Sequence, residues 1–416
     1  MKNTNNYKLL SSDWLLVCND EFQIIKDGAI VFNEQIIEVG STKELTKKYY
    51  NIKNEYQGIN SILMPGLINS HIHLEFSANR TTLKYGNFVQ WLFSVISNRE
   101  QLLEKATKNV IDNELKKMLR NGTTTIGAIS SYGFDMESCI QTPINVVYFT
   151  EILGSKPEMI DTLLLDFKAK LKSSISITKD NFTSGIAIHA PYSTHPFLIR
   201  EVLAIAKQQN IAVSAHFQES TAENDWLNYS SGEFELFFKD MLNQHKSLIT
   251  PSVFLDQFKN IKNLSFTHCI QANKKELKQI KDLNASIIHC PNSNRLLNNS
   301  ILDLNHTKDI PLAIGTDGLS SNYTLDIFKE IKNALFMHSN IEPNQLSSKL
   351  LLASTNGGAK ALGFKKGILE KDFDADIISF TLPDNCQTKE DLAIAIILNT
   401  KEIQTIHIKG KLIETT

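Results

Sequence analysis

The sequence predicts an α/β protein in which a (β/α)8 TIM barrel carries a small β-sandwich built from both termini. Between residues 63 and about 361, short β-rich runs alternate with amphipathic helical stretches, and eight such runs are the number that closes a barrel. Both ends of the chain instead hold short alternating runs separated by turn residues. The 416 residues also exceed the about 250 that an α/β barrel fills as one unit, which leaves room for a smaller second unit.

The predicted β-sandwich consists of residues 1–63 and 366–416. The first segment contains the runs DWLLVCND, FQIIKDGAIVF and EQIIEVG, and the last contains GILEKDFDADIISF and TKEIQTIHIKGKLIETT. Period-two alternation with Gly or Asn between the runs is typical of antiparallel strands. Because neither segment alone has enough apolar positions for a core, we expect the two segments to pair in space.

Residues 64–365 are predicted to form the barrel. Its strand candidates are 63–74, 122–130, 144–152, 184–191, 211–220, 264–270, 285–291 and 311–318. Amphipathic helices are predicted between them, for example at 102–121, 196–209 and 274–283. An open doubly wound sheet would alternate in the same way, but it normally shows a glycine-rich phosphate loop after its first strand, and none is found here.

Composition narrows the class of protein and of partner. Hydrophobic residues make up 42% of the chain and charged residues 21%, which excludes a disordered or fibrous protein. The net charge of −2, from 43 basic and 45 acidic side chains, is too small to recruit nucleic acid or an anionic membrane. Five cysteines without CxxC spacing indicate reduced thiols. Without a signal-peptide core or an apolar stretch of about 20 residues, we expect a cytoplasmic protein.

Polar residues gather where the predicted barrel strands end, which is where barrels of this class carry their chemistry. Six of the 11 histidines lie at such exits. They are His71, His73, His189, His216, His268 and His289. Any one of them alone is more often an ordinary core or surface residue. Six at matching positions favour a common site.

The His71-x-His73 pair predicts a metal site. With a period of two, both side chains point to the same face and can share one cation. Neutral imidazole suits Zn²⁺ and also Fe²⁺ or Ni²⁺. His216 and Asp317, from the fifth and eighth strands, would complete three nitrogens and one oxygen and leave a position open for water. For Asp317 the alternative is a turn residue, since Thr-Asp-Gly is common in turns.

A metal-bound water with a pKa lowered toward about 7 needs a partner that receives and returns its proton. Glu219 leaves the strand three residues after His216 and suits this role, although a carboxylate that complements a helix start is the alternative. We expect His268 to bond the water or polarise the centre under attack. His289 and Asn292 are predicted as residues of the pocket wall.

These residues lie in motifs that resemble the amidohydrolase superfamily, in its adenine and guanine deaminase and chlorohydrolase branch. The matching segments are MPGLINSHIHLEF, NGTTT, HAPYSTHP, HFQES, THC, HCPNSNRLL and IGTDGLSSNYTLD. The resemblance implies one divalent metal on the four predicted ligands, with Glu219 and His268 moving protons. Dinuclear members carry a bridging lysine where strand four ends; here that strand ends IAIHAP with His189, which implies the mononuclear centre associated with deamination.

The segment 75–100 after the first barrel strand is expected to cover the pocket. Trp91 and Phe88 would stack on a purine, or they simply pack in an amphipathic helix. Glu100 resembles the carboxylate that relatives use on a ribose hydroxyl, and Glu151 stands where related deaminases often carry Arg. The cations expected to meet an anionic group are Arg80, Arg99 and Arg295.

Within this family the covering segment and the HFQES motif look most like the 6-aminodeoxyfutalosine deaminases of the futalosine route to menaquinone. The resemblance implies hydrolytic deamination of an adenosine-like nucleoside whose tail ends in a benzoate. The alternatives are deamination of S-adenosylhomocysteine or methylthioadenosine, chlorohydrolase-type dehalogenation on the same centre, and a non-catalytic scaffold. Zinc is the expected metal, with iron as the alternative. The expected partner is a small nucleoside, and a homodimer is the default assembly.

Overall fold

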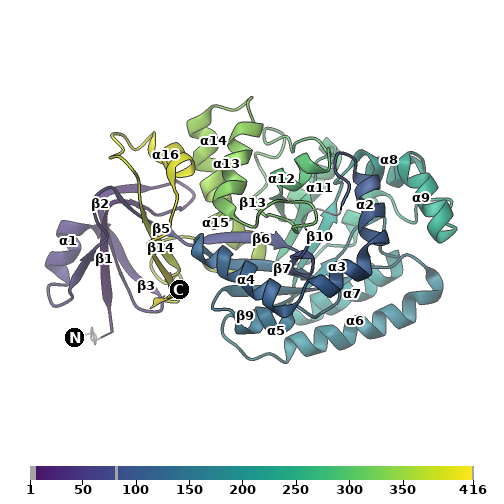
Figure 1. The fold of residues 1–416 in the computed structure, drawn as a ribbon, viewed down its shortest axis with the longest axis horizontal. Coiled ribbons are helices and arrows are strands. Elements are labelled where there is room, and N and C mark those ends of the chain that lie inside the picture. The colour runs from purple at the N-terminus through teal and green to yellow at the C-terminus, as the bar shows by residue number, and fades with distance from the viewer. Residues whose placement is uncertain (1–5, 80–82, 415–416) are drawn as a thin grey trace.

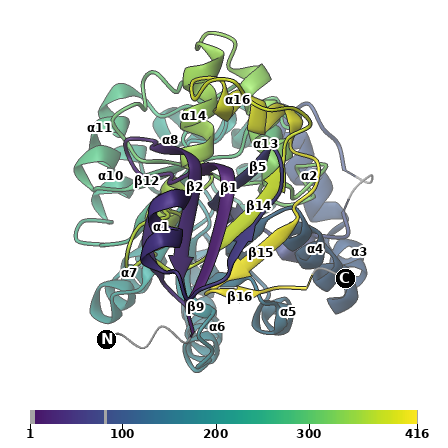
Figure 2. The ribbon, with the colours of Figure 1, turned by 90° about the vertical axis from the view of Figure 1, so that its left-hand side faces the viewer.

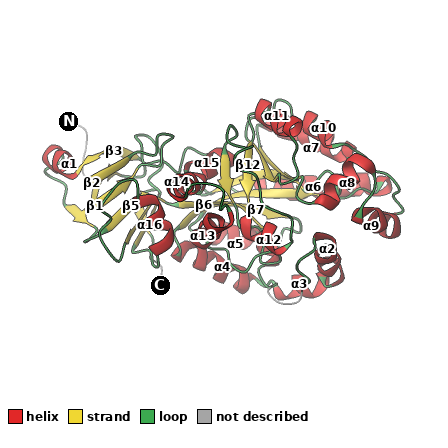
Figure 3. Ribbon diagram, turned by 90° about the horizontal axis from the view of Figure 1, so that it is seen from above, coloured by secondary structure: helices red, strands yellow, loops and turns green. Residues whose placement is uncertain are grey.

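The computed structural model describes residues 6–79 and 83–414. It shows a barrel of alternating strands and helices with a separate sheet at one end (Figure 1). The sheet lies at the end of the barrel away from helices α2 (Phe88–Ser97), α3 (Arg99–Lys105) and α9 (Glu233–Leu242), as the view from above also shows (Figure 3). In the described part of the chain, no helix has the length and apolar character needed to cross a membrane.

Eight parallel strands form the barrel, and each of the eight predicted runs overlaps one of them. In chain order they are β6 (Leu67–Ile72), β7 (Thr123–Ser130), β8 (Asn145–Ile152), β9 (Phe182–Ile188), β10 (Ala212–Phe217), β11 (Leu264–His268), β12 (Ser286–His289) and β13 (Leu312–Ile314). Each strand pairs with the next along the chain. Most strand residues are buried, because helices cover the outside and side chains fill the inside. The predicted barrel is confirmed.

Side chains and backbone just beyond the strands join the first strand to the last. The amide of Asp317 donates to the carbonyl of His71 at 3.0 Å. Asn69 on β6 bonds Thr316 twice, donating to its hydroxyl at 2.7 Å and accepting from its amide at 3.1 Å. Gly315 permits this approach, since a Cβ there would lie 2.8 Å from the Cβ of His71. The seam between β6 and β13 therefore lies directly beside the predicted ligands.

Helices follow the strands in the expected order. The remaining barrel helices are α4 (Lys108–Arg120), α5 (Met136–Gln141), α6 (Ile160–Ile175), α7 (Pro196–Gln209), α8 (Thr221–Tyr229), α10 (Pro251–Asp256), α11 (Lys274–Asp282), α12 (Pro291–Leu296), α13 (Ile327–Met337), α14 (Pro343–Ala353) and α15 (Asn356–Leu362), with short 3₁₀ turns η1 (Leu74–Phe76) and η2 (Pro157–Met159). The helix predicted at 102–121 is divided into α3 and α4. The backbone leaves the helical region at Ala106, and Thr107 is extended as the residue before α4.

Helices α2 and α9 lie against each other over the open end of the barrel. Phe88 meets Phe234 with ring centroids 6.0 Å apart, and Phe93 meets Phe237 at 5.1 Å. At the start of α2, the side chain of Asn87 accepts from the amide of Gln90, which caps the helix. The segment predicted to cover the pocket thus does so as a helix that packs on another helix.

The separate sheet combines both termini, as predicted. Its strands are β1 (Lys8–Leu16), β2 (Ile24–Phe32), β3 (Ile36–Ser41), β4 (Asn54–Tyr56), β5 (Ser61–Pro65), β14 (Ile377–Thr381), β15 (Thr405–Ile408) and β16 (Lys411–Leu412). Antiparallel pairing of β14 with β5 joins the two segments. The hydrogen-bonded path runs β16-β15-β14-β5-β1-β2-β3, and β4 pairs with β1 beside this path, so the eight strands form one mixed sheet. Figure 2 views it from outside, with helix α1 (Thr42–Lys48) on its outer face. Since β5 extends to Pro65, a division of the chain after residue 63 remains a prediction.

Candidate metal centre and active site

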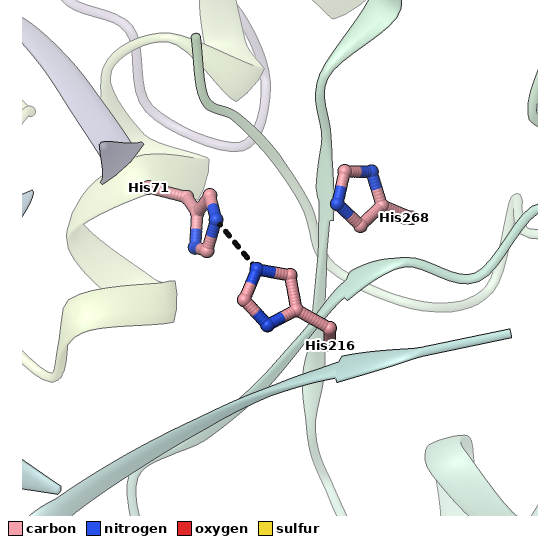
Figure 4. Close-up of side chains that lie close together, drawn as sticks. All are labelled: His71, His216 and His268. Carbon is pink, nitrogen blue, oxygen red and sulfur yellow. Dashed lines mark hydrogen bonds between the residues drawn. The ribbon is translucent and has the colours of Figure 1, made fainter. Parts of the chain in front are cut away.

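Three histidine side chains converge at the mouth of the barrel. The Nε2 atom of His71 lies 3.2 Å from that of His73 and 3.1 Å from that of His216, and the last two are 3.3 Å apart. Figure 4 shows His71 and His216 facing each other with His268 beside them. One proton can be shared between only two imidazole nitrogens, so it cannot give all three a hydrogen bond. Nitrogens about 2.1 Å from a shared tetrahedral cation lie roughly 3.4 Å apart, so this spacing suits a metal ion.

The surrounding groups turn the unprotonated nitrogen of His216 toward this point. The Nδ1 atom of His216 lies 2.6 Å from the carbonyl of His189, an acceptor, so Nδ1 carries the proton and Nε2 offers its lone pair. The Nδ1 atom of His71 lies 3.2 Å from the Thr267 hydroxyl. Burial lowers the pKa of His73 to about 3 and holds the pKa values of the other two below the ordinary value. The three rings are therefore neutral at neutral pH, as metal ligands must be.

Asp317 adds a carboxylate oxygen to the three nitrogens. Its Oδ1 lies 3.5 Å from Nε2 of His73 and 3.8 Å from Nε2 of His71. Its Oδ2 accepts from the hydroxyls of Ser293 at 2.8 Å and Ser321 at 2.9 Å. The residue has a φ of +59°, a left-handed conformation that costs energy and persists only where the surroundings impose it. Its orientation is thus fixed before any ion binds.

The four predicted ligands therefore come together from β6, β10 and the segment after β13. Three neutral imidazoles and one carboxylate are a donor set that suits a single divalent ion with a position left open for water. The carboxylate of Glu219 and the ring of His268 complete a neighbouring group with Asp317, in which the ligand atoms lie within 4.8 Å of one another.

Glu219 and His268 face each other beside the ligands. Oε1 of Glu219 lies 3.6 Å from Nε2 of His268 and accepts from the side chain of Asn299 at 3.4 Å. The Oδ1 atom of Asn294, an acceptor, lies 2.9 Å from Nδ1 of His268. Nδ1 therefore carries the proton of the ring, and Nε2 is unprotonated. Burial, and then the nearby charge of Asp317, raises the pKa of Glu219 well above the usual value. Both causes favour the protonated form of Glu219.

Two adjoining cavities lead to this cluster. The inner pocket, of about 110 Å³, is lined by His73, Phe76, Phe88, Trp91, Leu92, Val95, His189, Tyr192, His216, Glu219, His268, Asp317 and Ser320. The outer chamber, of about 440 Å³, has an apolar lining of Phe76, Leu92, Val95, Ile96, Leu153, Met159, Leu163, Tyr192, Phe237, Phe238 and Leu242. Its other lining residues are His73, Arg99, Ser131, Tyr132, Glu151, Gly154, Ser155, Lys156, His189 and Ser193.

The predicted substrate-binding residues divide between these cavities and the surface. Trp91 lines the inner pocket, and its Nε1–H donates to the carbonyl of Ser320 at 2.9 Å. His189 lines both cavities, and its Nδ1 lies 2.6 Å from the Ser193 hydroxyl. Arg99 and Glu151 line the outer chamber.

Other predicted residues lie away from both cavities. Glu100 and Arg295 are exposed, and neither lines the inner pocket or the outer chamber. The side chain of Asn292 donates to Glu330 at 2.6 Å, so it braces α12 against α13 and lines neither cavity. Arg80 lies outside the described residues.

Sequence reasoning missed the residues that hold the ligands in place. Ser293 and Ser321 fix Asp317, while Asn294 and Asn299 fix the proton-handling pair. The motif HCPNSNRLL contains two of these four residues, so polar residues just after strand ends were a signal. Glu75 was also missed, although it follows His73 by two positions. Its carboxylate turns away from the ligands and accepts from backbone amides of the segment 131–133.

Comparison with known proteins identifies a matching family and several relatives. Residues 62–413 match the model of the amidohydrolase family. The aminodeoxyfutalosine deaminase of Nitratiruptor sp. is 43% identical over 93% of this chain and 95% of its own length. A protein of Helicobacter pylori named adenosine deaminase is 34% identical over 97% and 99%. The crystal structure of Helicobacter pylori aminofutalosine deaminase with methylthio-coformycin superposes with a TM-score of 0.94, at 33% identity, over 98% of this chain and 100% of that one.

Proposed function

The chain belongs to the amidohydrolase family, and from this premise we propose that it deaminates 6-aminodeoxyfutalosine, converting the 6-amino group to a carbonyl and releasing ammonia. It is a hydrolase that acts on C–N bonds. The observation that carries the proposal is the mononuclear ligand set beside Glu219 and His268. The end of β9 supplies His189 where dinuclear members of the family have a bridging lysine. The 43% identity to an aminodeoxyfutalosine deaminase supports the choice of nucleoside.

We propose His71, His73, His216 and Asp317 as the ligands of one divalent ion, with zinc as the native metal. Three imidazoles with one carboxylate suit Zn²⁺, and Fe²⁺ accepts the same set. When bound, the ion acts as a Lewis acid that makes water nucleophilic at neutral pH. The residues around it supply the rest of the chemistry.

Glu219 is proposed as the proton carrier. Its raised pKa suits a group that alternates between carboxylate and carboxylic acid during turnover. Oε1 receives the proton of the attacking water and delivers it to N1 of the adenine ring, which makes C6 more electrophilic. Deaminases of a different fold also use a Glu that is not a metal ligand in this way.

His268 and Asp317 are proposed for the later steps. Nε2 of His268 has no hydrogen-bond partner among the described residues and faces the inner pocket, so it is free to accept a hydrogen bond from the hydroxyl group that adds to C6. Oδ1 of Asp317 takes the remaining hydroxyl proton and passes it to the departing amino group. Trp91 contributes an apolar wall to the inner pocket, which favours a flat purine ring.

Adenosine, methylthioadenosine and S-adenosylhomocysteine are the second candidates, and the name of the Helicobacter pylori relative favours including adenosine. They share the adenine ring that the inner pocket would receive. These nucleosides differ from 6-aminodeoxyfutalosine in the group attached at the 5′ position. The outer chamber therefore decides among them.

The test is a panel of adenine nucleosides given to the zinc-loaded protein. Ultraviolet loss of the 6-aminopurine chromophore and release of ammonia are followed together, and a chlorinated ring compound tests for chloride release. We expect ammonia from every nucleoside accepted and the highest kcat/KM for 6-aminodeoxyfutalosine. Chloride without ammonia would favour a chlorohydrolase. A protein that holds one metal equivalent yet releases neither would contradict the proposal and favour a scaffold.

We also propose the pathway, the compartment and the assembly of the enzyme. Conversion of 6-aminodeoxyfutalosine would serve the futalosine route to menaquinone in the cytoplasm, and we expect a homodimer as the commonest assembly of soluble enzymes. Light scattering of the purified protein tests the assembly, and a single-subunit mass would contradict it.

A further inference from the structure

The outer chamber carries a cation at a position that no part of the catalytic cluster uses. We propose that Arg99 is a specificity-determining residue that pairs with an anionic group at the far end of the nucleoside's 5′ substituent. This inference rests on the proposed function and concerns the selection of the nucleoside, not the deamination step. The chain would then favour nucleosides with an apolar, acidic tail.

The chamber has the size and surface for an apolar substituent. Its volume of about 440 Å³ is several times the volume of the inner pocket. Leu153, Met159, Leu163 and Phe237 are among the apolar side chains that α6, α9 and the segment after β8 contribute. Apolar walls of this kind gain free energy by covering a hydrophobic group, and they offer an aromatic ring a flat surface.

Arg99 is available to an anion. Its guanidinium lies over the ring of Tyr132, 5.1 Å from the centroid, and its side chain is exposed. Among residues 6–79 and 83–414 no carboxylate forms an ion pair with it. The other stacked arginine, Arg200 over Phe197, does have a neighbouring carboxylate, that of Glu201 at 3.5 Å. An arginine fork matches a carboxylate in two parallel hydrogen bonds.

The wall on which Arg99 rests is rigid. The buried carboxylate of Glu75 accepts from the amides of Ser131 at 2.8 Å, Tyr132 at 3.0 Å and Gly133 at 2.7 Å. Three hydrogen bonds to one buried carboxylate fix this loop and with it the ring of Tyr132. Arg99 is therefore held by a preformed surface at the rim, which reduces the entropy lost on binding.

A buried carboxylate lies at the inner end of the outer chamber. Glu151 is 4% exposed and accepts from the hydroxyl of Ser131, but its Oε1 has no partner among the described residues. It lies next to the cluster, with a ligand atom within 4.8 Å of those of His189 and His216. An anionic group is attracted by Arg99 and Lys156, the two cations of the chamber lining. A free hydroxyl, by contrast, can donate to Oε1 of Glu151.

The experiment compares two adenine nucleosides that differ only in charge at the tail. One carries a 5′ group ending in a benzoate, and the other is its methyl ester. Steady-state kcat and KM are measured for both with the wild type and with Arg99→Gln, Arg99→Lys and Arg200→Gln, all loaded with zinc. Arg200→Gln is the matched control, because it removes an exposed arginine that stacks on an aromatic ring outside the chamber.

The wild type is expected to prefer the acid over the ester. Arg99→Gln should reduce kcat/KM for the acid about ten- to a hundredfold, mainly through KM, and leave the ester within about twofold. Arg99→Lys should restore part of the preference, since it keeps the charge and loses the fork. Arg200→Gln should behave as the wild type does.

Three results would overturn the assignment of Arg99. They are an equal preference for acid and ester in the wild type, an unchanged preference in Arg99→Gln, and an equal loss on both substrates in that variant. In all three the ester is still deaminated by the wild type, so the proposed function would stand. Failure of the wild type to release ammonia from either nucleoside would instead count against the proposed function.

Discussion

In the described part of the chain, two groups of histidines are in contact, and only one of them suits a metal. At the barrel mouth the Nε2 atoms of His71, His73 and His216 lie 3.1–3.3 Å apart. Outside both cavities, His289 at the end of β12 meets His338 after α13, with their Nε2 atoms 3.0 Å apart. Distance alone does not separate the two groups.

The difference lies in the number of donors and in access. A single proton between His289 and His338 satisfies both Nε2 atoms, so this pair is a complete hydrogen bond. The first group has three nitrogens and the carboxylate of Asp317, more lone pairs than shared protons can satisfy. It also opens to the inner pocket. An excess of converging lone pairs beside a cavity therefore distinguishes a metal centre from a buried histidine contact.

The sharpest test of this comparison replaces one histidine of each group in a separate variant. His216→Ala is expected to lose most of its metal and to reduce kcat/KM by at least about 10⁴-fold, because activation of water depends on the ion. His338→Gln should keep one metal equivalent and activity within about twofold. Elemental analysis and steady-state kinetics measure both. Metal loss in the second variant would remove the distinction drawn between the groups.

A smaller effect is expected where the ligands remain but the proton carrier is removed. Glu219→Gln should retain a full equivalent of metal and lose about 10²–10⁴-fold in kcat, the range for general acid–base catalysis. The amide keeps the size of the side chain, so the unfolding temperature should change little. A variant with near-normal kcat would remove Glu219 from this role.

The smallest effect concerns stability alone and belongs to the second group. Burial lowers the pKa of His338 from 6.5 to about 4. Below pH 6.5 the unfolded chain binds a proton at this residue that the folded chain does not, so the free energy of unfolding falls as the pH falls toward 4. The slope is up to about 1.4 kcal/mol per pH unit for one such group.

His338→Gln should therefore show a shallower fall between pH 6.5 and 4 than the wild type. Urea unfolding at several pH values measures it, with the metal removed from both proteins so that ligand protonation contributes equally. Identical slopes would mean that His338 is protonated in the folded state.

The order of the barrel and its ligands could be predicted from sequence because both depend on local patterns. Buried parallel strands read as apolar runs, and period two places His71 and His73 on one face. The end of each strand then marks where its ligand must lie. Asp317 was predicted for the same reason, even though its support from Ser293 and Ser321 was not.

The outer chamber could not be predicted in the same way. Its lining comes from helices and loops whose relative positions depend on packing, such as the contact of Phe93 with Phe237. Glu100 and Arg99 are adjacent in sequence, yet only Arg99 lines the chamber, because helix geometry directs neighbours to different sides. Asn292 likewise follows a strand end but turns to Glu330 on α13.

The position of the ligands on the barrel seam has a consequence for biosynthesis. His71 and His73 leave the ribosome early, whereas Asp317 follows β13, the last strand of the barrel to be made. A nascent chain that ends before β13 lacks the carboxylate and the hydrogen bond that brings it to His71. With His71, His73, His216 and Asp317 as the proposed ligands, selective binding of the ion would wait until translation has passed that strand.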